Sequence, residues 1–140
     1  MSDVSVRVLG PHDATLLERV ADDVFDDPID PKLAAEFLGD PRHHLAVAID
    51  EGVVVGMASG VHYVHPDKPA ELWVNEVGVA PGYQRRGIGR RLMLALFQRA
   101  KELGCAEAWV GTETANLAAR GLYAAVGGNE STMIMVSFDL

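Results

Sequence analysis

A short run of the sequence, from Gln84 to Arg91, combines glycines and cations in a way that suits a bound diphosphate. Its glycines follow the pattern Gln84-x-x-Gly87-x-Gly89, and a residue without a Cβ lets a phosphate approach the backbone closely. Four of the chain's 12 Lys and Arg residues fall within seven positions: Arg85, Arg86, Arg90 and Arg91. The sequence therefore predicts an anion site, although a glycine-rich turn before a helix with solvated arginines has the same composition.

Carboxylates are a second group of residues that could take part in a reaction, because a carboxylate can attract an ammonium group and accept its proton. Glu76 lies a few residues before the predicted anion site, and Glu113 is a reserve candidate for the same role. Five aspartates gather around Pro28: Asp22, Asp23, Asp26, Asp27 and Asp30. Any one of them is more simply a solvated surface group, but the five together are a candidate cation-binding surface.

Apolar periodicity predicts the elements that position these groups. Residues 71–79 alternate as a strand, and from Gly87 the period is helical up to Leu103, just before Gly104. The anion site thus falls at a helix start, where free N–H groups and the helix dipole favour an anion. Further strands are expected over residues 4–9, 44–50, 53–62, 107–112 and 131–139, and further helices over residues 14–25, 33–38 and 116–126.

The order of these elements predicts an α/β fold with a mixed central sheet and helices on both faces. The helix between residues 71–79 and 107–112 should make those two strands parallel, through a right-handed crossover. No internal repeat or linker interrupts the pattern, so we expect residues 1–140 to form a single domain.

The composition narrows the range of functions. A net charge of −8 argues against bulk nucleic-acid binding and suits a cationic substrate. The single cysteine, Cys105, excludes an internal disulfide and fits a reducing, cytoplasmic location. The sequence has no signal-peptide pattern, no apolar run of membrane-spanning length and no histidine spacing typical of zinc sites, so we expect neither a membrane partner nor a metal.

Two segments resemble motifs of the GNAT acetyltransferase superfamily. Residues 84–89 resemble its acetyl-CoA pyrophosphate loop, Q/R-x-x-G-x-G/A, and residues 116–123 resemble its N-x-x-A-x-x-L-Y helix. The expected element order is also that of the GNAT fold, whereas Gly128 stands where the family usually has an aromatic residue. The resemblance implies acetyl-CoA as the cosubstrate, without a metal, and the following contacts to it: Val77, Val79, Gln84, Arg85, Arg86, Gly87, Ile88, Gly89, Arg90, Asn116 and Tyr123.

Within that superfamily, shorter segments resemble the small class I aminoglycoside 3-N-acetyltransferases. They comprise residues 25–28, 38–43, 75–79 and 135–139. The resemblance implies an aminoglycoside as the acceptor, and hence a role in antibiotic resistance. It leaves open a broader subfamily that acetylates other amines.

The resemblance also implies the chemistry, in which an amine attacks the acetyl thioester directly in a ternary complex. Glu76 is the first candidate for the base, with Glu113 or water as alternatives, and Tyr123 would protonate the leaving thiolate. A backbone N–H near Val79 would polarise the thioester carbonyl. The expected acceptor contacts are Asp26, Asp27, Glu76 and Glu113.

Other functions remain open at this point. The chain could acetylate a protein N-terminus, a lysine or a polyamine, or it could bind acetyl-CoA as a sensor without turnover. The sequence also leaves open whether the chain forms a homodimer.

Overall fold

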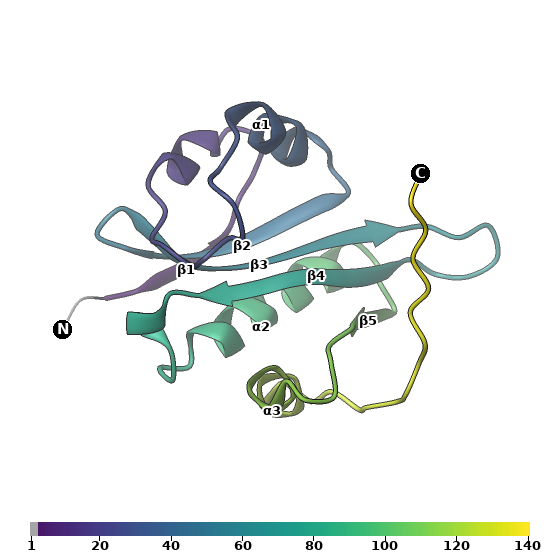
Figure 1. Ribbon diagram of the computed structural model, residues 1–140. Helices are drawn as coiled ribbons and strands as arrows, with labels where there is room; N and C mark the ends of the chain where they lie inside the picture. The colour runs from purple at the N-terminus through teal and green to yellow at the C-terminus, as the bar shows by residue number, and fades with distance from the viewer. Residues whose placement is uncertain (1–2) are drawn as a thin grey trace.

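A five-stranded sheet forms the centre of the structure, a computed structural model that describes residues 3–140 (Figure 1). Its strands lie in chain order: β1 (Ser5–Val8), β2 (His43–Asp50), β3 (Val53–Tyr63), β4 (Glu71–Val79) and β5 (Glu107–Val110). Neighbouring strands are antiparallel except β4 and β5, which are parallel. The mixed sheet and the parallel pairing of β4 with β5 are as expected.

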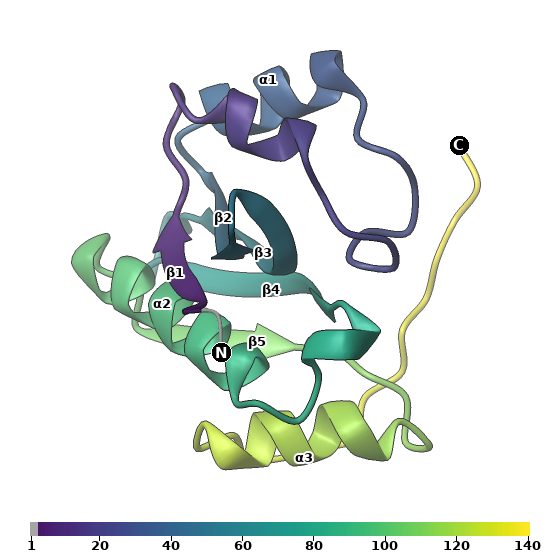
Figure 2. The same ribbon diagram turned by 90° about the vertical axis from the view of Figure 1, so that its left-hand side faces the viewer.

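Helices cover both faces of this sheet, as expected (Figures 1 and 2). The helix α1 (Pro31–Gly39) and the short 3₁₀ helix η1 (Ala14–Glu18) lie on one face. The helix α2 (Ile88–Glu102), which follows the 3₁₀ turn η2 (Pro81–Tyr83), lies on the other, and α3 (Leu117–Ala125) lies beyond β5. No helix within residues 3–140 combines the length and apolar character needed to cross a bilayer.

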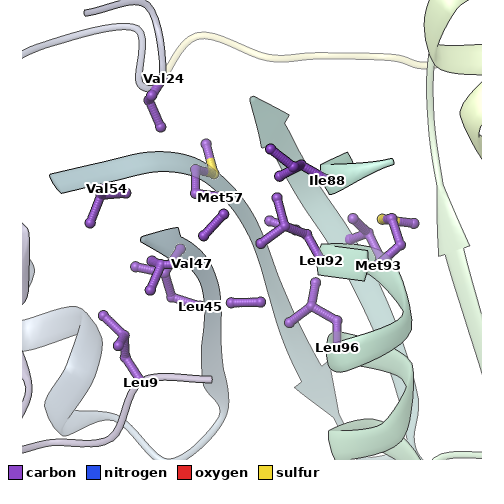
Figure 3. Close-up of a cluster of buried hydrophobic side chains, with 14 of the residues drawn as sticks. Leu9, Val24, Leu45, Val47, Val54, Met57, Ile88, Leu92, Met93 and Leu96 are labelled. Atoms are coloured by element: carbon purple, nitrogen blue, oxygen red, sulfur yellow. The ribbon is translucent and has the colours of Figure 1, made fainter. Parts of the chain in front are cut away.

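The core lies mainly between α2 and the sheet (Figure 3). Leu92 and Leu96 are fully buried, one helical turn apart, and they face the strand that carries Met57. The buried apolar residues all lie between Leu9 and Ala100. Within the described chain, β5, α3 and everything after them contribute no fully buried side chain.

The expected helix over residues 14–25 is wrong beyond Glu18. Only η1 is helical, and the chain then bends along the start of β3, where Ala21 N–H donates to the Val54 carbonyl at 2.9 Å. Asp23 adopts a left-handed conformation with φ of 65°, which a continuing α-helix does not allow. Val24 has helical spacing from earlier apolar residues, but it is buried as part of a loop.

The expected strand over residues 131–139 is also not part of the sheet. These residues run beyond α3 with no regular secondary structure, and every one of them is exposed. The remaining expected elements are confirmed, although β5 ends at Val110, two residues earlier than its pattern suggests.

The loop over residues 19–30 rests directly on β4. A Cβ added to Gly78 would overlap the carbonyl oxygen of Val24, so only glycine allows this approach. The contact holds the acidic part of the loop above β4.

Replacing Gly78 by Ala should therefore destabilise the protein by about 1–3 kcal/mol, because the added methyl group forces the loop and strand apart. Gly82→Ala is the matched control, since a Cβ there meets no atom within 4 Å. Urea unfolding of both variants tests the contact. Equal stabilities would show that the loop does not rest on Gly78.

Candidate functional site

The loop between β4 and α2 is held in shape by three side-chain contacts. The Tyr83 hydroxyl donates a hydrogen bond to the Asp50 carboxylate, and that bond raises the pKa of Tyr83 above its usual value. The Arg86 guanidinium stacks over the Tyr83 ring, 5.0 Å from its centroid. The Gln84 amide donates to the Val79 carbonyl at 3.1 Å. The first and third contacts tie this loop to Asp50 of β2 and to Val79 of β4.

Two residues of this loop have left-handed backbones, Arg85 with φ of 60° and Gly87 with φ of 75°. Gly87 is the N-cap of α2, and no side chain caps this helix. By contrast, Asp30 caps α1 and Asn116 caps α3 through side-chain hydrogen bonds. The first N–H groups of α2 thus remain available to an anion, as the glycine pattern predicts.

The side chains around this helix start divide into two sets. Arg85, Arg86 and Arg90 are exposed beside it and can meet an anion. Arg91 instead donates to the Val4 carbonyl at 3.0 Å. Ile88 is buried in the core, so only its backbone can contact a ligand.

Gly89 has a structural role that the sequence did not reveal. A Cβ at this position would lie 3.2 Å from the Leu122 side chain of α3. The absence of a side chain therefore lets α2 and α3 pack closely. The sequence suggested another reason for a glycine at this position, namely that it lets a phosphate approach the backbone. A bulky residue at Gly89 would displace α3 and would not test anion binding cleanly.

The sheet opens beside this helix start. Pairing between β4 and β5 ends at Val74 and Val110, although β4 continues to Val79. Val77 and Val79 therefore lie on a stretch of β4 that has no described strand on its β5 side. Such an edge can form backbone hydrogen bonds with an extended ligand.

Tyr123 lies on α3, and Asn116 is the N-cap residue that precedes this helix. The Asn116 side-chain oxygen accepts a hydrogen bond from Ala119 N–H at 3.1 Å, so this atom serves the helix cap. Tyr123 is half-buried, and burial raises the pKa of its hydroxyl. The phenol is therefore protonated at neutral pH and can act as a proton donor.

On the α1 side of the sheet, a hollow of about 320 Å³ brings acidic residues from two elements together. Glu76 of β4 lines it together with Asp26, Asp27 and Asp30 from the loop before α1. Apolar side chains from η1, the loop before α1, α1 itself and β2 also line it, among them Leu17, Phe25, Leu33, Phe37 and Leu45. Asp22 and Asp23 do not line this hollow, so the aspartate cluster is split.

Asn75 also lines this hollow, a position that sequence reasoning missed. The register between β3 and β4 shifts between Ser59 and Gly60, so that Asn75 has no partner residue in the pairing. This bulge gives adjacent residues, Asn75 and Glu76, access to the same hollow. The sequence did contain a signal for this bulge, because Gly60 interrupts the pattern of a strand.

Glu113 is not brought to this hollow. It follows β5 and lines a separate cleft, which Tyr123 also lines. Among residues 3–140, no group of three or more metal-ligating side chains is placed to hold a metal ion.

Two tryptophans form a stacked pair across the sheet that the sequence did not lead us to expect. Trp73 of β4 and Trp109 of β5 are register partners, and their rings stack with centroids 5.6 Å apart. The Trp109 indole N–H donates to the Tyr63 hydroxyl at 2.7 Å. Each tryptophan is the third residue of its strand, and this equal position was the feature of the sequence that could have predicted their pairing.

Residues 14–127 match the acetyltransferase (GNAT) family. N-alpha-acetyltransferase RimI of Mycobacterium tuberculosis (strain ATCC 25618 / H37Rv) is 38% identical over 104 residues, which cover 74% of this chain and 63% of that protein. The match thus spans less than two thirds of this curated relative.

The fold is similar to that of aminoglycoside acetyltransferases. One is meta-AAC0020 from an uncultured soil metagenomic sample, in complex with sisomicin, with a TM-score of 0.83, 20% identity and coverage of 98% of this chain and 96% of the other. Another is AAC(6′)-Iy with a bisubstrate analogue, with a TM-score of 0.81, 18% identity and coverage of 99% of both chains. At these identities the likeness concerns the fold alone.

These relatives support the expected superfamily, but they do not single out the class I aminoglycoside 3-N-acetyltransferases. The family match covers most of the chain, and both motifs lie on the elements expected of them. The chain therefore belongs to the acetyltransferase (GNAT) family.

Proposed function

We propose that this protein transfers an acetyl group from acetyl-CoA to a primary amine of a small polycation, with an aminoglycoside as the leading case. The proposed class of acceptor rests on one observation, which is that Glu76, Asp26 and Asp27 line the same hollow. The same strand that holds Glu76 leads through Val79 into the uncapped start of α2. An acceptor and a diphosphate can thus bind at neighbouring parts of β4.

The residues present suit acetyl-CoA. The N–H groups at the start of α2 and the arginines around them would hold its pyrophosphate, and the open edge of β4 would bind its amide-containing arm. Acetyl-CoA supplies the activated acetyl thioester. Glu76 would accept the proton that the ammonium group loses, directly or through water, and Tyr123 would give a proton to the departing sulfur.

Replacing both Arg86 and Arg90 by Ala should weaken acetyl-CoA binding by about 10-fold or more, because two charge-assisted contacts to phosphate are removed. Calorimetric titration with acetyl-CoA measures the effect. Arg99→Ala is the matched control, since Arg99 lies near the opposite end of α2 and pairs with Glu102. Equal affinities for the double variant and the wild type would contradict this placement of the pyrophosphate.

The negative charge of the hollow is the reason for proposing a polycationic acceptor. Single exposed ion pairs contribute only about 0–1 kcal/mol each, so one carboxylate would not select a substrate. Several ammonium groups of one molecule can engage several carboxylates at once, and such affinity falls with salt. The net charge of −8 favours the approach of a polycation in the same way.

Asp26→Asn combined with Asp27→Asn should raise the KM of a polycationic amine and flatten its dependence on salt. The affinity for acetyl-CoA should stay near the wild-type value. Asp22→Asn combined with Asp23→Asn removes the same charge from the same loop outside the hollow, and it should have a smaller effect. If the two double variants behave alike, the hollow is not the acceptor site.

A second acceptor deserves testing because of the identity to RimI, which is named an N-alpha-acetyltransferase. A protein N-terminus also presents a primary amine, and it would require space for the following residues of the peptide. Acetylation of neutral or acidic peptides without acetylation of polycations would favour this alternative over our proposal.

A further inference from the structure

The sheet face that carries the acidic hollow continues beyond it as an exposed aromatic surface. On β3, Ser59 and Val61 are two positions apart, so their side chains point to the same face. Their partners on β4 are Glu76 and Trp73, which therefore share that face, and Ser59 and Glu76 both line the hollow. The helix α1 packs over β2 on this side of the sheet, and β4 and β5 lie beyond it (Figure 1). Trp73 and its stacked partner Trp109 lie in this outer part of the face.

The two tryptophans form one aromatic surface that a ligand can reach. Their rings are nearly parallel, with an angle of 19° between the ring planes, so each ring covers one face of the other. Trp73 nevertheless remains 37% exposed and Trp109 36% exposed. Tryptophan is highly buried on average, so two adjacent exposed tryptophans indicate a binding surface. Among side chains, the indole ring also attracts cations most strongly.

Two carboxylates stand at the outer end of this aromatic pair. Glu71 and Glu107 are register partners, and each lies two residues before the tryptophan of its own strand, so both share the face of the tryptophans. Like charges directly opposite each other destabilise a sheet, so a bound cation would be favourable here. His65 donates to the Glu71 carboxylate at 2.6 Å, which holds that side chain in place. The aromatic pair thus has carboxylates on both sides, because Glu76 lies toward the hollow.

We infer that Trp73, Trp109, Glu71 and Glu107 form a second subsite for the acceptor, which binds a cationic ring remote from the amine that is acetylated. The inference rests on the proposed function, because Glu76 and the hollow define where the reacting amine lies. The partners of Glu76, Trp73 and Glu71 follow one another at every second position of β3. At about 3.4 Å per residue, Glu76 lies roughly 7 Å from Trp73 and roughly 14 Å from Glu71 along the sheet.

These spacings narrow the class of acceptor. A single-ring amine placed at Glu76 is too short to reach the carboxylates beyond the tryptophans. An aminoglycoside with several rings can place one ring at the hollow and another against the tryptophans, with its ammonium groups near carboxylates at both ends. The second subsite therefore selects extended polycations over short ones, and it contributes affinity without taking part in the reaction.

Intrinsic fluorescence tests this subsite directly, because Trp73 and Trp109 are the only tryptophans of the chain. Kanamycin, an aminoglycoside with several rings, should reduce the quenching of tryptophan emission by acrylamide, with a midpoint equal to its dissociation constant from calorimetry. Glucosamine, a single-ring amine, should leave the quenching unchanged. Neither measurement needs acetyl-CoA or turnover.

The outcomes separate this inference from the proposed function. Kanamycin binding that leaves both tryptophans unprotected would overturn the inference and leave the proposed function standing. Protection without any acetylation of kanamycin would support the subsite and contradict the proposed function. Absence of kanamycin binding would overturn the proposed class of acceptor and this subsite together.

A substitution at Trp73 provides the second test. Trp73→Leu should raise the KM for kanamycin about 10-fold, while kcat and the KM for acetyl-CoA stay near their wild-type values, because only a remote contact is lost. Trp73→Phe keeps an aromatic ring and is the matched control, so its KM should rise less. Thermal unfolding of both variants checks that they fold. An unchanged KM for kanamycin in a folded Trp73→Leu variant would contradict the second subsite.

Discussion

Replacing Tyr123 by Phe should lower the rate of acetyl transfer about 100-fold, which is the scale of general acid catalysis. The phenyl ring keeps the packing of α3, so the KM for acetyl-CoA should change little. Burial raises the pKa of Tyr123, and the hydroxyl therefore stays protonated throughout the neutral range. The loss should accordingly be similar from pH 6 to pH 8.

A single-turnover measurement is the suitable readout for Tyr123, because slow product release could hide a change in the chemical step. Tyr63→Phe is the matched control, since it removes a hydroxyl that bonds Trp109 and lies outside the proposed proton path. An unchanged single-turnover rate in Tyr123→Phe would reduce this residue to a packing role.

Replacing Glu76 by Gln should lower kcat by about 100-fold or more at pH 7, because the base that deprotonates the ammonium group is lost. Part of the activity should return at higher pH, since a free alkylammonium has a pKa of about 10 and becomes neutral without help. The pH profile of kcat therefore separates loss of the base from loss of fold.

Glu113→Gln provides the matched control for the base. Glu113 does not line the acidic hollow that holds Glu76, so this variant should retain nearly full activity. If Glu113→Gln loses activity with recovery at high pH while Glu76→Gln does not, the assignment of the base is reversed.

The conformation of the loop proposed to bind the pyrophosphate was predictable because its signals are local. Gly87 marks the left-handed N-cap of α2, and the strand before it and the helix after it have clear apolar periods. The acidic hollow was only partly predictable. Asp26 and Glu76 are fifty positions apart in sequence, and the contact of Val24 with Gly78 brings their segments together.

The two wrong elements share one physical cause, which is that periodicity does not reveal what a segment packs against. Val20 and Val24 have helical spacing, yet backbone pairing with Val54 holds this stretch as an irregular loop. Residues 131–139 have the apolar content of a strand, but no strand of the described chain pairs with them. Gly89 shows the same limit, because its contact with Leu122 depends on how two helices meet.

The most direct test of the proposed function is acetyl transfer from acetyl-CoA to a panel of amines, followed by release of free thiol and by the mass of the product. The panel should contain aminoglycosides, polyamines, and neutral, acidic and basic peptides, each measured at low and high salt. We expect turnover with polycationic small molecules, strongest at low salt, and a product heavier by one acetyl group. Absence of turnover with every amine, despite acetyl-CoA binding, would contradict the account and favour a sensor, whereas turnover confined to peptides would contradict the proposed acceptor.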